Sequence, residues 1–211
     1  MIQNIILDVD GTLWNTTEIV AEAWNEAIEA DGATTICVDA KRLQGLFGRP
    51  MNVIGEMLFT DVDAADRARL LDACCEYEQR ALHEGEYHLL YKGVAETMRT
   101  LAENGISLYI VSNCQSGYIE LFLEKNKLED VVKDIECYGN TGKSKGSNIL
   151  LLMERGTLAA DETVYVGDTI GDYEASKEAG ISFIFAEYGF GDVPQADSRI
   201  QKFEDLLQMC L

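Results

Sequence analysis

The chain has 211 residues, of which 47% are hydrophobic and 26% are charged, so its composition is that of a folded protein with one substantial core and room for a smaller insertion. Its 37 acidic residues outnumber its 17 basic residues and give a formal charge of -20. This charge repels nucleic acid and anionic membranes at long range, so neither is an expected partner. An anionic substrate would need a local positive group or a bound cation.

The six cysteines show no CxxC spacing, and two of them, Cys74 and Cys75, are adjacent. This pattern fits neither a zinc site nor a disulfide framework, so we expect reduced and mostly buried thiols. The chain opens without the charged and apolar segments of a secretory signal, and no apolar run approaches the roughly 20 residues of a membrane helix. We therefore expect a cytoplasmic protein.

The predicted core alternates strands and helices. Short apolar runs, typical of strands buried on both faces of a parallel sheet, lie at residues 4–7, 107–111, 163–166 and 182–185. Helical patterns lie between them at residues 94–101, 149–153 and 172–179, the first followed by Gly105 and the last by Gly180. This alternation predicts an α/β fold with a doubly wound, Rossmann-like parallel sheet.

One region breaks the alternation, because residues 15–87 contain helical patterns and no convincing buried strand. Apolar residues recur there at helical spacing, for example at residues 19–28 and 70–81. We expect residues 1–14 and 88–211 to form the core domain, with 15–87 as an all-helical cap domain inserted after the first strand.

Ligands of such sheets bind at the carboxyl ends of the strands. The polar residues expected at that edge are Asp8, Asp10, Ser112, Asn113, Asp168 and Asp172, with Lys143 and Lys145 before a later helix. Acidic groups brought together there repel one another unless a cation lies between them, and Mg²⁺ binds carboxylate and carbonyl oxygens. A lysine, a serine hydroxyl and backbone amides can bind the oxygens of a phosphate.

These segments, in this order, resemble the haloacid dehalogenase superfamily over essentially the whole chain. Residues 8–12 read Asp-Val-Asp-Gly-Thr at a strand end, and residues 167–172 supply a downstream Gly-Asp-x-x-x-Asp. The resemblance is to phosphoglycolate phosphatase-like and β-phosphoglucomutase-like members with a small helical cap. It implies that Asp8 attacks phosphorus to give an aspartyl-phosphate, while Asp10 protonates the leaving oxygen and then activates water.

The resemblance also implies the remaining roles. Ser112, Asn113 and Gly11 would bind the phosphoryl group, and Lys145, with Lys143 as the alternative, would neutralise its charge. Mg²⁺ would be held by Asp8, Asp168 and the backbone carbonyl of Asp10. Asp172 would be either a further ligand or a group that holds the metal water and the lysine.

The expected function is hydrolysis of a small phosphorylated metabolite by a Mg²⁺-dependent phosphatase. Dehalogenases of the family lack the second acid, which Asp10 supplies here. A sugar phosphomutase is one alternative, although Val20 stands where those enzymes carry a histidine, and a non-catalytic protein that binds a phosphorylated ligand is another. In the cap, Arg49 within Gly48-Arg49-Pro50 is a candidate for binding a second negative charge on the substrate, with a solvated turn residue as the alternative. The ester and the oligomeric state stay open.

Overall fold

A computed structural model describes residues 1–211. The chain divides into two compact units: a core unit of Met1–Asn15 and Leu90–Leu211, and a cap unit of Thr16–Leu89. The core unit therefore consists of the start of the chain and of all residues that follow the cap unit.

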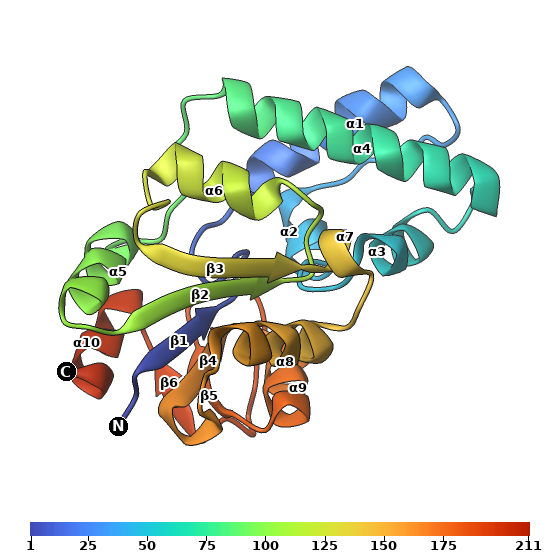
Figure 1. The fold of residues 1–211 in the computed structure, drawn as a ribbon. Coiled ribbons are helices and arrows are strands. Elements are labelled where there is room, and N and C mark those ends of the chain that lie inside the picture. Colours follow the sequence, from blue (N-terminus) through green and yellow to red (C-terminus); the bar gives the residue numbers. More distant parts are fainter. The chain divides into compact units, whose positions relative to one another are not determined.

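The core unit is built on six parallel strands in the order β3-β2-β1-β4-β5-β6 (Figure 1). Their bounds are β1 Asn4–Leu7, β2 Ser107–Ser112, β3 Val132–Cys137, β4 Thr163–Gly167, β5 Ser182–Ala186 and β6 Ser198–Ile200. In the centre, Asn4 of β1 lies opposite Ser107 of β2 and Thr163 of β4. All four residues of β1 are buried, because the strand has neighbours on both edges and side chains packed on both faces. The α/β fold class and the four predicted strands are confirmed.

Two strands, β3 and β6, were not predicted from the sequence. Strand β3 is an edge strand with charged residues at Lys133, Asp134 and Glu136, so it offers no apolar run. Arg155 of helix α8 pairs with two of these, at 2.7 Å from Asp134 Oδ2 and 2.8 Å from Glu136 Oε2. Strand β6 has only three residues and forms the opposite edge. Edge strands exposed to water do not need the apolar pattern by which buried strands are recognised.

Helices cover both faces of this sheet. They are α5 Val94–Glu103, α6 Tyr118–Asn126, α7 Tyr138–Thr141, α8 Lys145–Gly156, α9 Ile170–Ala179 and α10 Leu206–Cys210, with short 3₁₀ turns at Ala160–Glu162 and Phe203–Asp205. Helices α8 and α9 pack together on one face, where Ile149 and Ala175 join Ile6 and Tyr165 of the strands in one buried cluster (Figure 1). This packing fixes the first turns of α8 and α9 close to the carboxyl edge of the sheet.

The cap unit consists of α1 Thr17–Asp31, α2 Ala40–Gln44, α3 Met51–Leu58 and α4 Ala64–Glu84, and it contains no strand. Helices α1 and α4 pack along each other (Figure 1). Their interface buries Glu78, whose carboxylate accepts a 2.8 Å hydrogen bond from Trp24 Nε1. At the far end of α1, Asp31 pairs with Arg69 of α4 at 2.8 Å. The all-helical character expected of this insertion is confirmed.

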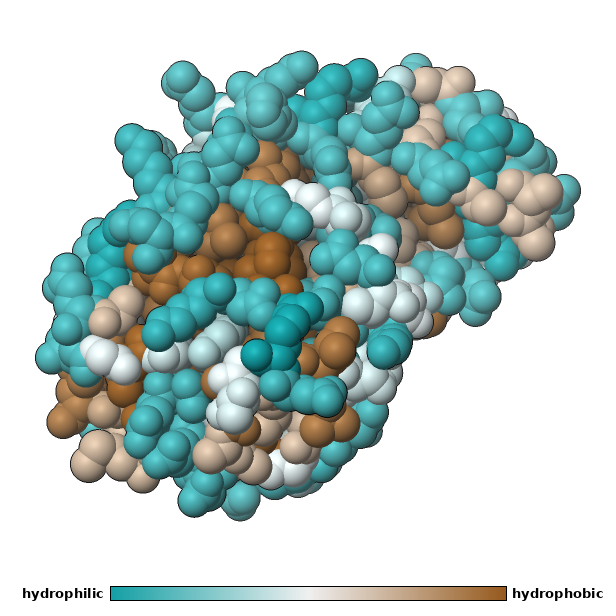
Figure 2. Space-filling view, in the orientation of Figure 1, coloured by the Kyte–Doolittle hydropathy of each residue, from teal (hydrophilic) through white to brown (hydrophobic).

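The surface agrees with the composition. On the face drawn in Figure 2, hydrophilic side chains cover most of the area, and an apolar patch is visible beside α6 and β3 of the core unit. No helix of the chain combines the length and the apolar character that crossing a membrane requires.

Candidate active site

The site begins at the turn that follows β1. Asp8 still donates its backbone N–H to the Val166 carbonyl of β4, at 2.9 Å, so its side chain is fixed by the sheet. The chain then folds back, and the carbonyl of Val9 accepts from Leu13 N at 2.8 Å. Gly11 enables this turn with a φ of +82°, and a Cβ at that position would lie 2.1 Å from Asp168 Oδ2. A glycine is required here by both the backbone conformation and the adjacent carboxylate.

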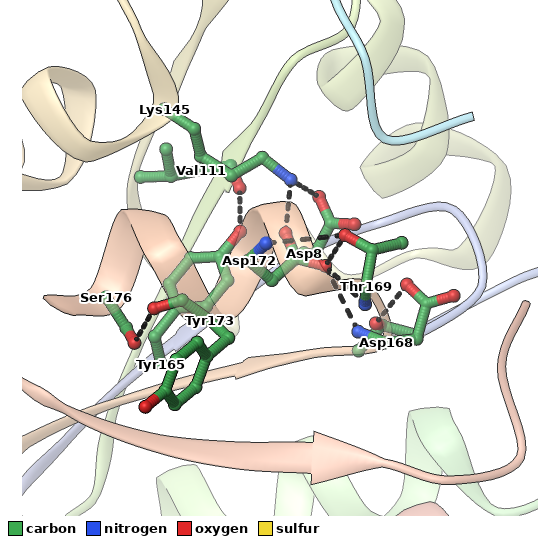
Figure 3. A network of polar contacts seen from close by, with 10 residues as sticks. Asp8, Val111, Lys145, Tyr165, Asp168, Thr169, Asp172, Tyr173 and Ser176 are labelled. Carbon is green, nitrogen blue, oxygen red and sulfur yellow. Dashed lines mark hydrogen bonds and ion pairs between the residues drawn. The ribbon is translucent and has the colours of Figure 1, made fainter. Parts of the chain in front are cut away.

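Lys145 connects two of the acidic residues (Figure 3). It is the first residue of α8, and its Nζ lies 3.0 Å from Asp8 Oδ1 and 2.5 Å from Asp172 Oδ1. All three side chains are at most 4% exposed. The ammonium therefore binds both carboxylates where water cannot screen the charges, and such charge-assisted hydrogen bonds are the strong ones.

Asp172 holds the start of α9 as well as the lysine. Its Oδ2 accepts hydrogen bonds from Asp168 N at 3.1 Å, Thr169 N at 2.9 Å and Thr169 Oγ1 at 2.7 Å (Figure 3). Thr169 and Asp172 form a capping box, in which each side chain binds the other residue's backbone N–H. Both oxygens of Asp172 are therefore engaged by donors of the chain, so this residue positions Lys145 and the turn that carries Asp168.

Asp168 lies directly after β4 and is fully buried. Its Oδ2 accepts from Phe190 N at 2.7 Å, and its Oδ1 lies 3.4 Å from Thr12 Oγ1. Glycines allow the neighbouring chain to approach, since a Cβ at Gly189 would lie 2.2 Å from Asp168 Cβ. The segment after β5 therefore forms a wall of the site and donates a backbone N–H to it.

Ser112 and Asn113 follow β2 at the same edge of the sheet. Ser112 is 4% exposed, and the nearness of its hydroxyl to the Asp8 carboxyl lowers the pKa of that group. Asn113 begins the loop that follows. The structure therefore brings a hydroxyl of β2 to the carboxylate that ends β1.

Asp10 lies on the turn after β1 and is only partly buried. Its carboxylate accepts hydrogen bonds from the Tyr118 hydroxyl and from Trp14 Nε1. These contacts of Asp10 differ from the Lys145 contact of Asp8, so the two acids of the first motif have different surroundings. Asp8 lies within a buried charge cluster, whereas Asp10 is only partly buried.

The electrostatics of the cluster favour a cation. Asp8, Asp168 and Asp172 offer carboxylate oxygens within 4.8 Å of one another, against the single ammonium of Lys145. Burial raises the pKa of the Asp8 carboxyl; Lys145 opposes this rise and Asp172 adds to it. Burial, followed by the charges of Asp172 and Asp8, raises the pKa of Asp168 well above its usual value. Burial alone would lower the pKa of Lys145, but the two carboxylates beside it raise that pKa above its ordinary value.

One oxygen atom of the cluster is itself suited to be a metal ligand. Asp8 Oδ2 is buried and accepts no hydrogen bond, and a buried carboxylate oxygen without a donor is costly. Mg²⁺ prefers hard oxygen ligands such as this one and those of Asp168. The residues present therefore fit a divalent cation of the magnesium kind.

Lys143 and Arg49 lie apart from the contacts of Lys145. Lys143 is exposed on the loop before α8, so Lys145 is the lysine that the structure brings to Asp8. Arg49 belongs to the cap unit, where its Nη1 donates to the carbonyl of Gly45 at 2.7 Å. Its role toward substrate stays a prediction. Phosphate binding by Gly11 also stays a prediction, because the Gly11 N–H donates to the Trp14 carbonyl at 3.0 Å.

Several residues of the site were not found by sequence reasoning. These are Thr12, Trp14, Tyr118, Thr169 and Phe190. Thr169 carried a usable signal, because a threonine three residues before an acid at a helix start is a capping-box pattern. No comparable signal in the sequence pointed to Tyr118, since 108 residues separate it from Asp10.

Known proteins resemble this chain in sequence and in fold. The sequence profile of the family described as haloacid dehalogenase-like hydrolase matches residues 5–186. The chain therefore belongs to the haloacid dehalogenase-like hydrolases. It is similar to a protein named phosphoglycolate phosphatase from Agrobacterium fabrum, with 29% identity over 91% of this chain and 83% of the relative. A protein of the same name from Photobacterium profundum is 28% identical over 90% of this chain and 85% of its own.

Solved structures support the fold. A predicted phosphoglycolate phosphatase from Haemophilus somnus superimposes with a TM-score of 0.88 at 18% identity, over 100% of this chain and 98% of its own. CbbY from Rhodobacter sphaeroides, solved in complex with xylulose-(1,5)-bisphosphate, gives a TM-score of 0.81 at 22% identity, over 98% and 96% of the two chains. At this identity the likeness concerns the fold.

Proposed function

We propose that this protein is a Mg²⁺-dependent phosphatase that hydrolyses a small phosphate monoester through an aspartyl-phosphate at Asp8. The observation that carries the proposal is the buried contact between Lys145 Nζ and Asp8 Oδ1, at 3.0 Å, beside an Asp8 Oδ2 that accepts no hydrogen bond. The lysine fixes the orientation of the carboxylate through Oδ1, while Oδ2 carries no hydrogen bond that a metal or a substrate would have to displace. A protein that only bound phosphate would gain nothing from a carboxylate there, because it repels the ligand.

The chemistry follows in two steps. The Asp8 carboxylate attacks phosphorus, the bond from phosphorus to the ester oxygen breaks, and Asp10 gives its proton to that leaving oxygen. Asp10 then takes a proton from water, which attacks the aspartyl-phosphate, releases phosphate and restores Asp8. Lys145 and the Ser112 hydroxyl stabilise the negative charge on the phosphoryl oxygens during both steps.

The metal would be held by Asp8, Asp168 and the backbone carbonyl of Asp10. When bound, Mg²⁺ would offset the mutual repulsion of the buried carboxylates and of the phosphate oxygens that approach them. Asp172 would act from behind, because its oxygens already accept from Lys145, Asp168 N and Thr169.

The proposed substrate is a small phosphorylated acid or sugar. The names of the two relatives above support a phosphate ester of a short hydroxy acid, such as phosphoglycolate. The burial of the Asp8 carboxylate favours a compact ester.

The proposal is tested with a panel of phosphate monoesters that includes p-nitrophenyl phosphate, phosphoglycolate and sugar phosphates. We expect phosphate release with Mg²⁺ and none after treatment with EDTA, with recovery when Mg²⁺ is added back. Turnover that persists in EDTA would refute the role of the metal. Binding of phosphate without turnover of any ester would favour the non-catalytic alternative, and transfer of phosphate between positions of one sugar would favour a mutase.

The cap residue Arg49 provides a separate prediction. If its guanidinium binds a second negative charge of the substrate, Arg49→Ala raises KM for phosphoglycolate by roughly 10-fold, the scale of one charge-assisted hydrogen bond, and leaves p-nitrophenyl phosphate unchanged. Steady-state kinetics on both esters measures this. Equal kinetics of variant and wild type on all esters would leave Arg49 only its bonds to the carbonyls of Gly45 and Leu46.

A further inference from the structure

Asp10 is held by two aromatic side chains of the core unit. The Tyr118 hydroxyl donates to Asp10 Oδ1 at 2.7 Å, and Trp14 Nε1 donates to the same oxygen at 3.1 Å. Tyr118 is the first residue of α6, and Trp14 follows the turn after β1. The two donors therefore reach one carboxylate oxygen from separate segments of the core unit.

Both donors are themselves fixed in position. Trp14 and Tyr118 are each 2% exposed, and their rings meet edge to face with centroids 5.5 Å apart. The Trp14 ring also packs against Phe122, one turn further along α6, at 5.0 Å. The Trp14 carbonyl accepts from Gly11 N at 3.0 Å, which ties the indole to the turn that carries Asp10. Rings held in this way lose little conformational freedom when they form a hydrogen bond.

We propose that Tyr118, together with Trp14, is a positioning residue for the acid–base group Asp10, an inference that rests on the function proposed above. Both donors bind Oδ1, so together they fix the rotation of the Asp10 carboxyl group and the direction in which its Oδ2 points. The aromatic pair thereby fixes which oxygen delivers the proton and in which direction. An acid–base group must lie within hydrogen-bond reach of the reacting oxygen, and a carboxyl group free to rotate spends only part of its time there.

A positioning role toward Asp10 can be detected by comparing esters whose leaving groups differ in basicity. An alkyl ester, such as glycerol phosphate, has a basic leaving oxygen that must be protonated as its bond to phosphorus breaks. The p-nitrophenolate of p-nitrophenyl phosphate leaves without that help. Loss of proton delivery therefore slows the alkyl ester more than the aryl ester, whereas general damage to the site slows both alike.

The test compares kcat/KM of Tyr118→Phe with that of the wild type on these two esters, because kcat/KM reports on the first phosphoryl transfer. The variant removes one oxygen atom and keeps the ring, so its packing against Trp14 persists. We expect a loss of roughly 10-fold on glycerol phosphate, a part of the 10²–10⁴-fold that general acid catalysis contributes, and little change on p-nitrophenyl phosphate. Trp14→Phe, which removes the second donor, should shift the two esters in the same direction.

Two reference variants make the result specific. Asp10→Asn removes the acid itself, so it measures the largest difference between the losses of kcat/KM on the two esters. Tyr118→Phe should reproduce part of that difference. Tyr165→Phe also removes a buried hydroxyl, which donates to the Val111 carbonyl at 2.7 Å rather than to Asp10, so it should change both esters by the same factor. Thermal unfolding of each variant measures whether it is folded.

The outcomes separate the two proposals. A selective loss on glycerol phosphate in folded Tyr118→Phe supports the positioning role. Equal losses on both esters, or no loss on either, overturn it while the phosphatase assignment stands. Absence of turnover of any ester by the wild type overturns the proposed function and this inference together.

Discussion

Replacing Asp8 by Asn is expected to lower phosphate release from p-nitrophenyl phosphate by roughly 10⁴-fold or more, the scale seen when a central catalytic group is removed. The amide has the shape of the carboxylate but cannot attack phosphorus. Its oxygen can still accept from Lys145, so the surrounding geometry persists. The variant also removes one of three buried acids, and we therefore expect a thermal stability equal to or above that of the wild type.

The measurement combines phosphate release with acid-quench trapping of the covalent intermediate. Wild type incubated with substrate should carry an acid-stable phosphoryl group, and Asp8→Asn should carry none. Asp130→Asn, a matched exchange at an exposed position, should behave as the wild type. The expected residual activity of Asp8→Asn is about 0.01% of that of the wild type. A variant that retains more than about 1%, two orders of magnitude above this value, would contradict nucleophilic catalysis by Asp8.

Replacing Lys145 by Met is expected to damage both catalysis and stability. The side chain is 4% exposed and pairs with Asp8 and Asp172, so its removal leaves two buried carboxylates without their cation. Breaking a buried ion pair from one side typically costs about 3–5 kcal/mol, and the loss of one transition-state donor costs roughly 10²–10³ in kcat. Urea unfolding followed by circular dichroism measures the first effect, and steady-state kinetics measures the second.

Lys143→Met is the matched control, because this lysine lies two residues earlier and is exposed. It should keep the activity and the unfolding midpoint of the wild type. A Lys145→Met protein as stable and as active as the wild type would contradict the network drawn in Figure 3. The reverse pattern, with Lys143→Met inactive, would assign the phosphate-contacting role to the other lysine.

The fold could be predicted where its physics is local. Strands buried on both faces, such as Asn4–Leu7 and Thr163–Gly167, are continuous apolar runs, and helices with one buried face show a regular repeat. Strand β3 escaped prediction because its polar residues are satisfied across space, by Arg155 from another helix. A partner 19 or more residues away leaves no trace in the pattern of the strand itself.

The candidate site divides in the same way. The carboxyl-edge acids Asp8, Asp10 and Asp168 follow from strand ends and from the resemblance of their motifs to a known superfamily. Lys145 was preferred to Lys143 because it stands nearer the start of the later helix, but the contact with Asp8 that decides between them depends on how α8 packs against α9. Tyr118 was invisible for the same reason, since its relation to Asp10 depends on how α6 packs beside the turn after β1.

The central place of β1 has a consequence for how the protein is made. Asn4 pairs with Ser107 and Thr163, so the strand that bears Asp8 is synthesised first and gains its two neighbours only after the cap unit and much of the core have followed. Contacts so distant in the chain form late and slow folding. Until then the apolar residues of β1 stay uncovered on the nascent chain, where they are open to misassociation. Lys145 and Asp168 also lie beyond the cap unit, so no fragment that ends before β4 can assemble the charge cluster.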